Sequence, residues 1–112
     1  MNNRKKLIKK LDDLARAKVR ARGKCEVCGK TETLQVAHIF SRRHKGVRWD
    51  EDNLLLLCYY HHLHFAHTNP VEFSEWVRSY LGEQKYNRLR VKARVITKFS
   101  EFDLEQLIEN YE

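Results

Sequence analysis

Apolar positions recur at steps of three and four along both ends of the chain, which is the spacing of amphipathic helices. Glycine follows the first two of these segments, at Gly23 and Gly82, where helices commonly end. Pro70 stands at the start of the second segment, where its missing N–H is not needed. The pattern predicts four helices, at residues 4–22, 71–81, about 83–96 and 103–111.

The centre of the chain has short apolar runs in place of helical periodicity. Residues 33–40 are typical of a short strand, and the four leucines at 54–57 predict a second strand that pairs with it. A polar loop at residues 41–52 separates the two runs, and residues 59–67 can form a helix. The predicted order is strand, loop, strand, helix, with further helices on both sides, which is an α+β arrangement.

The chain has 112 residues, and we expect one domain made of a basic helix (1–24), a central core (25–67) and a helical C-terminal extension (68–112). Its formal charge of +7 is unevenly distributed. Residues 1–48 carry 15 Lys and Arg against 4 Asp and Glu, whereas residues 49–112 carry 7 against 11. The basic half fits a polyanionic partner such as nucleic acid better than it fits a merely soluble surface.

Hydropathy and cysteine content indicate the compartment. No apolar run has the length of a membrane span, and the first residues lack the apolar region of a secretory signal. The chain has three cysteines, an odd number, and two of them, Cys25 and Cys28, are separated by only two residues. This spacing argues against a disulfide framework and for a metal site in a reducing compartment. We therefore expect a cytoplasmic protein without a membrane partner.

Four residues have the spacing of a structural zinc site. Cys25 and Cys28 form a C-x2-C knuckle closed by Gly29, and Cys58 and His61 repeat the spacing 30 residues later. Two thiolates so spaced can reach one tetrahedral Zn²⁺, and three cysteines with one histidine are an accepted structural set. A redox pair is the alternative for an isolated C-x2-C, but it favours a βαβ setting that the pattern lacks. We predict a structural Zn²⁺ that stabilises a small core.

Histidines gather in the same central segment, at positions 38, 44, 61, 62, 64 and 67. Imidazole titrates near neutral pH and binds metals, so this segment is the candidate site. His38, Asn53 and His62, at intervals of 15 and 9 residues, resemble the HNH endonuclease motif. The run N-L-x-x-L-C-x-x-H-H that begins at Asn53 is similar to the family's N-L-x-x-L-C-x-x-C-H, with His61 in place of a cysteine.

The resemblance covers about residues 25–67 and implies a ββα-metal core, clipped by the structural zinc and flanked by N- and C-terminal helices. It implies a metal-dependent DNA endonuclease that hydrolyses phosphodiester bonds. His38 would be the general base, and Asn53 would either hold the loop that orients it or contact the metal. His62 would bind one catalytic divalent ion, such as Mg²⁺ or Mn²⁺. The layout after His67 is more loosely similar to small phage HNH proteins, which implies a bacterial or phage-infected host cell.

Two positions depart from the family pattern. Ala37 precedes His38, where the family usually has a metal-binding Asp or His. Ala66 stands about one turn after His62, where another ligand often lies. We hypothesise that His67, or alternatively His64, completes the catalytic metal site, with water or phosphate in the remaining positions.

Four cations occupy the loop between the predicted strands, and we expect them to contact the DNA backbone rather than base edges: Arg42, Arg43, Lys45 and Arg48. Low sequence specificity and strong salt dependence follow from such contacts. Ala37 keeps a second hypothesis open, a non-catalytic zinc-stabilised DNA-binding module. The amphipathic C-terminal helices raise a third, a component of a phage packaging or recombination complex with a phage or host protein partner. The sequence does not separate a monomer from a homodimer.

Overall fold

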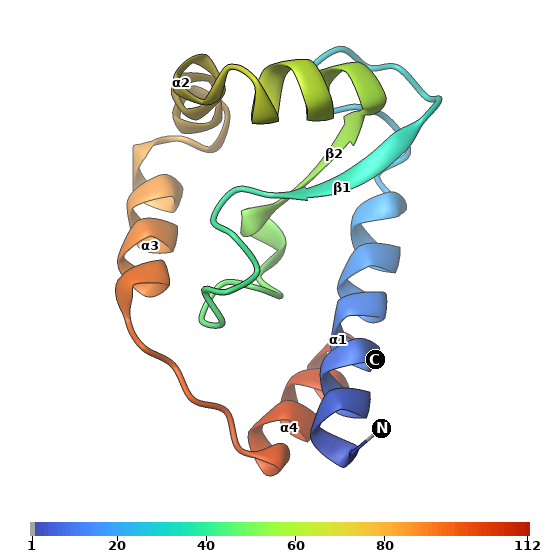
Figure 1. Cartoon of the computed structure of the whole chain (residues 1–112), viewed down its shortest axis with the longest axis vertical. Helices are drawn as coiled ribbons and strands as arrows, with labels where there is room; N and C mark the ends of the chain where they lie inside the picture. Colours follow the sequence, from blue (N-terminus) through green and yellow to red (C-terminus); the bar gives the residue numbers. More distant parts are fainter. Residues whose placement is uncertain (1) are drawn as a thin grey trace.

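The computed structural model of the chain describes residues 2–112, as helices arranged around a two-stranded sheet (Figure 1). Its strands and the short helices beside them are β1 (Leu34–His38), the 3-10 helix η1 (Glu51–Asn53), β2 (Leu54–Cys58) and the π-helix η2 (His61–His67). The α-helices are α1 (Asn3–Arg20), α2 (Pro70–Leu81), α3 (Glu83–Arg94) and α4 (Glu101–Tyr111). The predicted α+β class, with its order of strand, loop, strand and helix, is confirmed.

The ends of the elements differ from the predicted ends by at most two residues. Helix α4 starts at Glu101, before its predicted start, because Ser100 and Asp103 form a capping box. At the other end of the chain, the side chain of Asn2 caps α1 by accepting a hydrogen bond of 2.8 Å from the N–H of Lys5. None of the helices that the structure describes is long and apolar enough to cross a membrane.

The hairpin is antiparallel, with Leu34 opposite Cys58 at one end and His38 opposite Leu54 at the other. Leu54 and Leu56 face α1 and α4, in a core cluster that also contains buried residues of those two helices. Leu55 and Leu57 point to the other face and pack against α2. Helices therefore cover both faces of β2, which explains why its sequence is a continuous apolar run instead of an alternating one.

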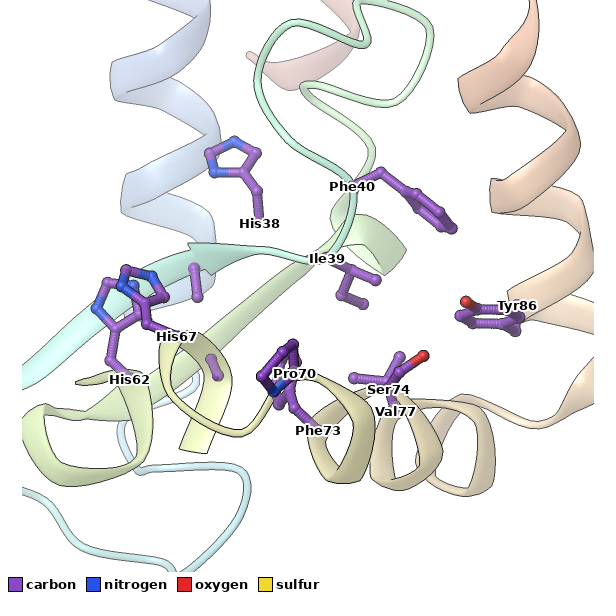
Figure 2. A pocket seen from close by; sticks show the side chains of 12 residues that line it. His38, Ile39, Phe40, His62, His67, Pro70, Phe73, Ser74, Val77 and Tyr86 are labelled. Atoms are coloured by element: carbon purple, nitrogen blue, oxygen red, sulfur yellow. The ribbon is translucent and has the colours of Figure 1, made fainter. Parts of the chain in front are cut away.

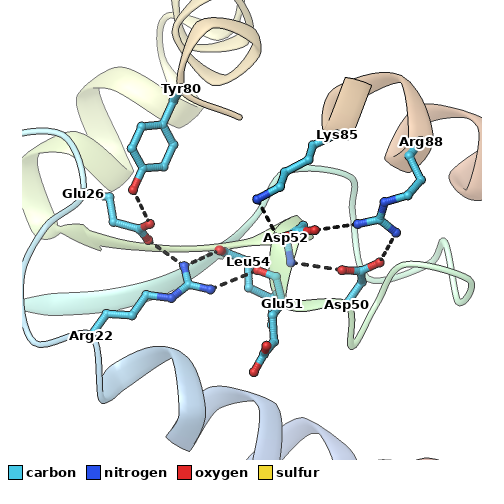
Figure 3. Close-up of polar contacts among 9 residues, drawn as sticks. All are labelled: Arg22, Glu26, Asp50, Glu51, Asp52, Leu54, Tyr80, Lys85 and Arg88. Atoms are coloured by element: carbon cyan, nitrogen blue, oxygen red, sulfur yellow. Dashed lines mark hydrogen bonds and ion pairs between the residues drawn. The ribbon is translucent and has the colours of Figure 1, made fainter. Parts of the chain in front are cut away.

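A partly buried carboxylate ties several elements together beside the cysteine knuckle (Figure 3). Glu26 accepts hydrogen bonds from the N–H of Leu56 at 2.6 Å, from Arg22 at 2.8 Å and from the hydroxyl of Tyr80 at 2.7 Å. Burial, together with the Glu26 carboxylate, raises the pKa of Tyr80 to about 12. The turn after α1, the knuckle, β2 and α2 therefore meet at one polar contact.

A second group of ion pairs holds α3 to the segment that leads into β2 (Figure 3). Arg88 pairs with Asp50 at 2.9 Å and with Asp52 at 2.6 Å. Lys92 also reaches Asp50, at 3.1 Å. These contacts fix α3 beside the loop between the strands, and they neutralise two of the cations that the helix presents.

Candidate metal centres and the histidine cleft

The four residues predicted to bind zinc lie together where β2 meets η2. The ligand atoms of Cys25, Cys28, Cys58 and His61 all lie within 4.8 Å of one another. The Sγ of Cys58 is 3.3 Å from Nδ1 of His61 and 3.8 Å from the Sγ of Cys28. Three thiols and one imidazole at this separation suit a tetrahedral Zn²⁺, so these residues can bind a metal such as zinc.

The backbone of the knuckle makes this convergence possible. Gly29 has a φ of 79°, in the left-handed region that glycine adopts without strain. Its N–H donates to the carbonyl of Cys25 at 2.8 Å, and the N–H of Cys25 donates to the carbonyl of Lys30 at 2.8 Å. Burial raises the pKa of the Cys25 thiol, but hydrogen bonds from the surrounding backbone outweigh it and hold that pKa below its ordinary value. The low pKa favours the thiolate, which is the form that binds metals.

The helix after β2 is a π-helix, and this changes which histidines share a face. In a π-helix, residues five apart in sequence lie one turn apart, whereas in an α-helix they are separated by about 140° around the axis. The rings of His62 and His67, five residues apart, have centroids only 4.6 Å apart. His64 instead lies against Tyr60, at a centroid distance of 5.0 Å. The structure therefore brings His67, and not His64, beside His62.

A cleft of about 320 Å³ lies between the hairpin, η2 and α2, and its lining includes His38, His62 and His67 (Figure 2). Figure 2 shows the rings of His62 and His67 together, whereas the ring of His38 projects from the end of β1. Ala37 also lines the cleft, and among the residues that the structure describes this lining contains no carboxylate. Histidines of two elements, β1 and η2, thus line one cleft, whose described lining offers no acidic ligand.

Gln35 orients His62, and sequence reasoning missed it. The Nδ1 of His62 is 2.5 Å from the side-chain oxygen Oε1 of Gln35. An amide oxygen only accepts hydrogen bonds, so Nδ1 carries the proton and Nε2 keeps its lone pair. The sequence contained one signal: Gln35 stands two residues before Ala37, and alternate residues of a strand share a face. The partner residue lies 27 positions away, beyond the reach of a local pattern.

Asn53 is fully buried and is directed toward the loop backbone. Its amide accepts a hydrogen bond from the N–H of Phe40 at 2.8 Å and donates to the carbonyls of Phe40 at 2.9 Å and Val47 at 3.0 Å. These bonds join the two arms of the loop that follows His38. Of the two roles left open for Asn53, the geometry supports holding the loop.

The electrostatic surroundings of His38 favour its neutral form. Burial lowers the pKa of this imidazole below its ordinary value, and the positive charge of Arg42 lowers it further. A hydrogen bond with the backbone of Arg48 and the charge of Asp12 act in the opposite direction but do not outweigh the first two causes. A neutral imidazole can accept a proton, so the position suits a general base.

The structure divides the four loop cations into two pairs. Arg48 donates two hydrogen bonds to Asp12 of α1, at 3.0 and 2.7 Å, and Arg42 donates a third at 3.0 Å. Burial raises the pKa of Asp12, but these guanidinium groups and a neighbouring indole N–H lower it more. Arg42 and Arg48 therefore fasten the loop to α1. Within residues 2–112, no carboxylate lies within ion-pair distance of the other two, Arg43 and Lys45.

The region that contains these features matches a known family. Residues 25–67 match the family model described as HNH endonuclease. The match spans the knuckle, both strands, the loop between them and η2. Comparison with curated proteins and with solved structures found no match for the chain.

The zinc set makes a direct prediction about composition and stability. The purified protein should hold about one tightly bound Zn²⁺ per chain, and Cys58→Ser should lose most of it, as measured by elemental analysis. Structural zinc contributes about 10–16 kcal/mol in zinc-finger peptides, against a total of about 5–15 kcal/mol for an ordinary domain. Cys58→Ser should therefore be largely unfolded at 25 °C by circular dichroism.

His64→Ala is the matched control, because His64 lies on the same helix but outside the cysteine cluster. It should keep both the zinc and the cooperative thermal transition. Full zinc retention in Cys58→Ser would show that the ligand set is wrong.

Proposed function

We propose that the protein is a metal-dependent DNA endonuclease of low sequence specificity, because residues 25–67 match the model of the HNH endonuclease family, whose members act on DNA. One observation carries the proposal: His38 lines the same cleft as the His62–His67 pair. A DNA-binding module without activity would not need a histidine of lowered pKa in the lining of a cleft to which two further histidines contribute.

His38 acts as the general base in this proposal. Hydrolysis of a phosphodiester requires removal of a proton from the attacking water, and an imidazole of lowered pKa is unprotonated at neutral pH. The ring must also stay in place, and the three hydrogen bonds of Asn53 hold the backbone of the loop that begins two residues later. Asn53 is therefore a positioning residue, acting on His38 through the loop.

His62 and His67 are the residues that would hold the catalytic divalent ion. Their paired rings fit such an ion, because both can present a ring nitrogen to one cleft and the hydrogen bond to Gln35 leaves Nε2 of His62 free. A divalent ion bound there would supply a Lewis acid for the scissile phosphate. Mg²⁺ prefers oxygen ligands, whereas imidazole suits Mn²⁺, Co²⁺, Ni²⁺ and Zn²⁺ better. A ligand set of two imidazoles without a carboxylate therefore favours a transition metal over Mg²⁺.

The lining of the histidine cleft also supports a second candidate function. Ala37 cannot bind a metal, and the described lining contains no carboxylate to replace the family's usual ligand. A zinc-stabilised module that binds DNA without cutting it is therefore the alternative. The alternative predicts DNA binding without nicking in any divalent metal, which the following experiment measures.

Plasmid nicking by the wild type and by His38→Ala tests the proposed base. With Mn²⁺, Co²⁺ or Ni²⁺ added to the zinc-loaded protein, His38→Ala should nick about 10²–10⁴-fold more slowly, the usual contribution of a general base. As the pH falls, the nicking rate at saturating DNA should stay constant to a pH below about 6.5, which is the pKa of an ordinary histidine. The lowered pKa of His38 keeps its imidazole neutral over this range. His64→Ala, which lies outside the cleft, should match the wild type.

Equal nicking rates in the wild type and in His38→Ala would exclude His38 as the base. An acidic limb that stays at the same pH when His38 is replaced would show that another group titrates. Absence of nicking by the wild type in every metal would favour the module that binds without cutting.

His67→Ala against His64→Ala tests which histidine joins His62. Loss of one of two imidazole ligands should raise the Mn²⁺ concentration for half-maximal nicking by about 10-fold or more. A 10-fold increase corresponds to a loss of only about 1.4 kcal/mol of metal-binding free energy. His64→Ala should leave that concentration unchanged. The reverse order of the two variants would assign the second ligand to His64 and contradict the geometry of η2.

Gln35→Leu and Gln35→Glu test the orientation of His62. Loss of an outer-shell partner weakens metal binding by about 10–100-fold, so Gln35→Leu should require that much more Mn²⁺ for activity. Gln35→Glu keeps an acceptor for the Nδ1 proton and should retain tight activation. Nitrogen-15 chemical shifts of His62 should show the proton on Nδ1 in the wild type and in Gln35→Glu. A mixed population of the two tautomers in the wild type would contradict the assigned role of Gln35.

A further inference from the structure

A second cleft, of about 510 Å³, lies between the loop that joins the strands and the segment that joins α3 to α4. Four cations contribute to its lining: Arg43 and Lys45 from the loop, Arg94 from the last position of α3, and Lys98 from the segment that follows. None of the four lines the histidine cleft. We refer to this region as the basic cleft.

A close backbone approach builds the basic cleft. A Cβ on Gly46 would lie 3.0 Å from the carbonyl oxygen of Lys92 and 3.1 Å from Oγ1 of Thr97, so glycine allows the loop to touch the end of α3. Beside it, Nδ1 of His44 lies 3.0 Å from the carbonyl oxygen of Ala93 and therefore donates a hydrogen bond to it. The two loop cations and the two cations at and after the end of α3, about 50 residues apart in sequence, are thus held on one surface.

The four cations of the basic cleft differ from their neighbours in pairing. Arg42 and Arg48 are paired with Asp12, and Lys92 is paired with Asp50. Across residues 2–112, by contrast, no carboxylate lies within ion-pair distance of any member of the basic cleft. Like charges repel when they converge without counter-charges, so a bound polyanion would relieve this repulsion.

We propose that the basic cleft binds the phosphate backbone of DNA and holds the substrate on a surface separate from the histidine cleft. The proposal rests on the proposed function for the identity of the polyanion. Arg43 follows His38 by only five residues, which can span at most about 18 Å, so a duplex bound at His38 can also reach the loop side of the basic cleft. Val95 and Ile96, which are 59% and 90% exposed, lie in the same lining and offer apolar contacts to deoxyribose and base edges.

Phosphate contacts of this kind have a measurable signature. Each neutralised phosphate of duplex DNA contributes about 0.9 to the slope of log K against log of the salt concentration. Removal of two cations that each neutralise a phosphate should lower the magnitude of this slope by about 2. A change that only perturbs the fold has no reason to alter the slope by that amount.

The test compares two double substitutions that each remove two cations. Arg94→Gln with Lys98→Gln removes the two cations that the end of α3 and the segment after it contribute to the basic cleft. Lys24→Gln with Lys30→Gln is the matched control on the cysteine knuckle, which flanks the Cys58 end of the hairpin, whereas the loop flanks the His38 end. Both are made in a His38→Ala background, and fluorescence anisotropy measures binding of a labelled duplex of about 20 base pairs across a salt series, without added divalent metal.

We expect the Arg94/Lys98 pair to lower the slope by about 2 and the control pair to leave it nearly unchanged. An equal effect of the two pairs would reduce the proposal to general positive charge and overturn it, as would an unchanged slope for the Arg94/Lys98 pair. Thermal unfolding by circular dichroism confirms that each variant is folded. Because binding is measured without cleavage, a wild type that nicks no DNA would reject the nuclease proposal while leaving this result intact.

Discussion

The antiparallel pairing of β1 with β2 is the constraint on which both candidate sites depend. Its register sets Cys58 opposite Leu34 beside the zinc set, and His38 opposite Leu54 at the mouth of the loop. A shift of one residue would turn every side chain of the hairpin to the other face. Burial of β2 on both faces opposes such a shift only weakly, because either face accepts leucine. The cysteine cluster, which needs Cys58 at one position, therefore helps to specify the register.

The π-helix η2 connects the cysteine cluster to the histidine cleft. His61 turns toward the thiols, with Nδ1 3.3 Å from the Sγ of Cys58, and the next residue, His62, turns toward Gln35 of β1. Both of these partners are fixed by the hairpin, since Cys58 ends one strand and Gln35 lies on the other. The wider turn of the π-helix then carries His67 back to His62. Folding around the zinc set thus arranges the imidazoles of the cleft.

Local patterns in the sequence predicted the elements and the zinc set, because periodicity and ligand spacing are properties of neighbouring residues. They did not predict η2 as a π-helix, since its seven residues show no period of their own. They also could not show that Asp12 engages Arg48, a contact across 36 positions. For this reason, the sequence grouped the four loop cations as one DNA-binding set. In the structure, two of them hold the loop to α1, and no described carboxylate lies within ion-pair distance of the other two. Long-range electrostatics, invisible to a local pattern, decides which cations can bind a partner.

The absence of a carboxylate from the described lining of the histidine cleft has a consequence for how metal and DNA would bind. Two neutral imidazoles would leave a divalent ion with its full charge, whereas an Asp in the place of Ala37 would cancel part of it. The phosphate of the substrate would then be the first anionic ligand that the ion meets. Each ligand would bind more tightly in the presence of the other, and by linkage the two effects are equal. Substitution of Asp for Ala37 should weaken this coupling, because the protein would then supply the negative charge that DNA otherwise provides.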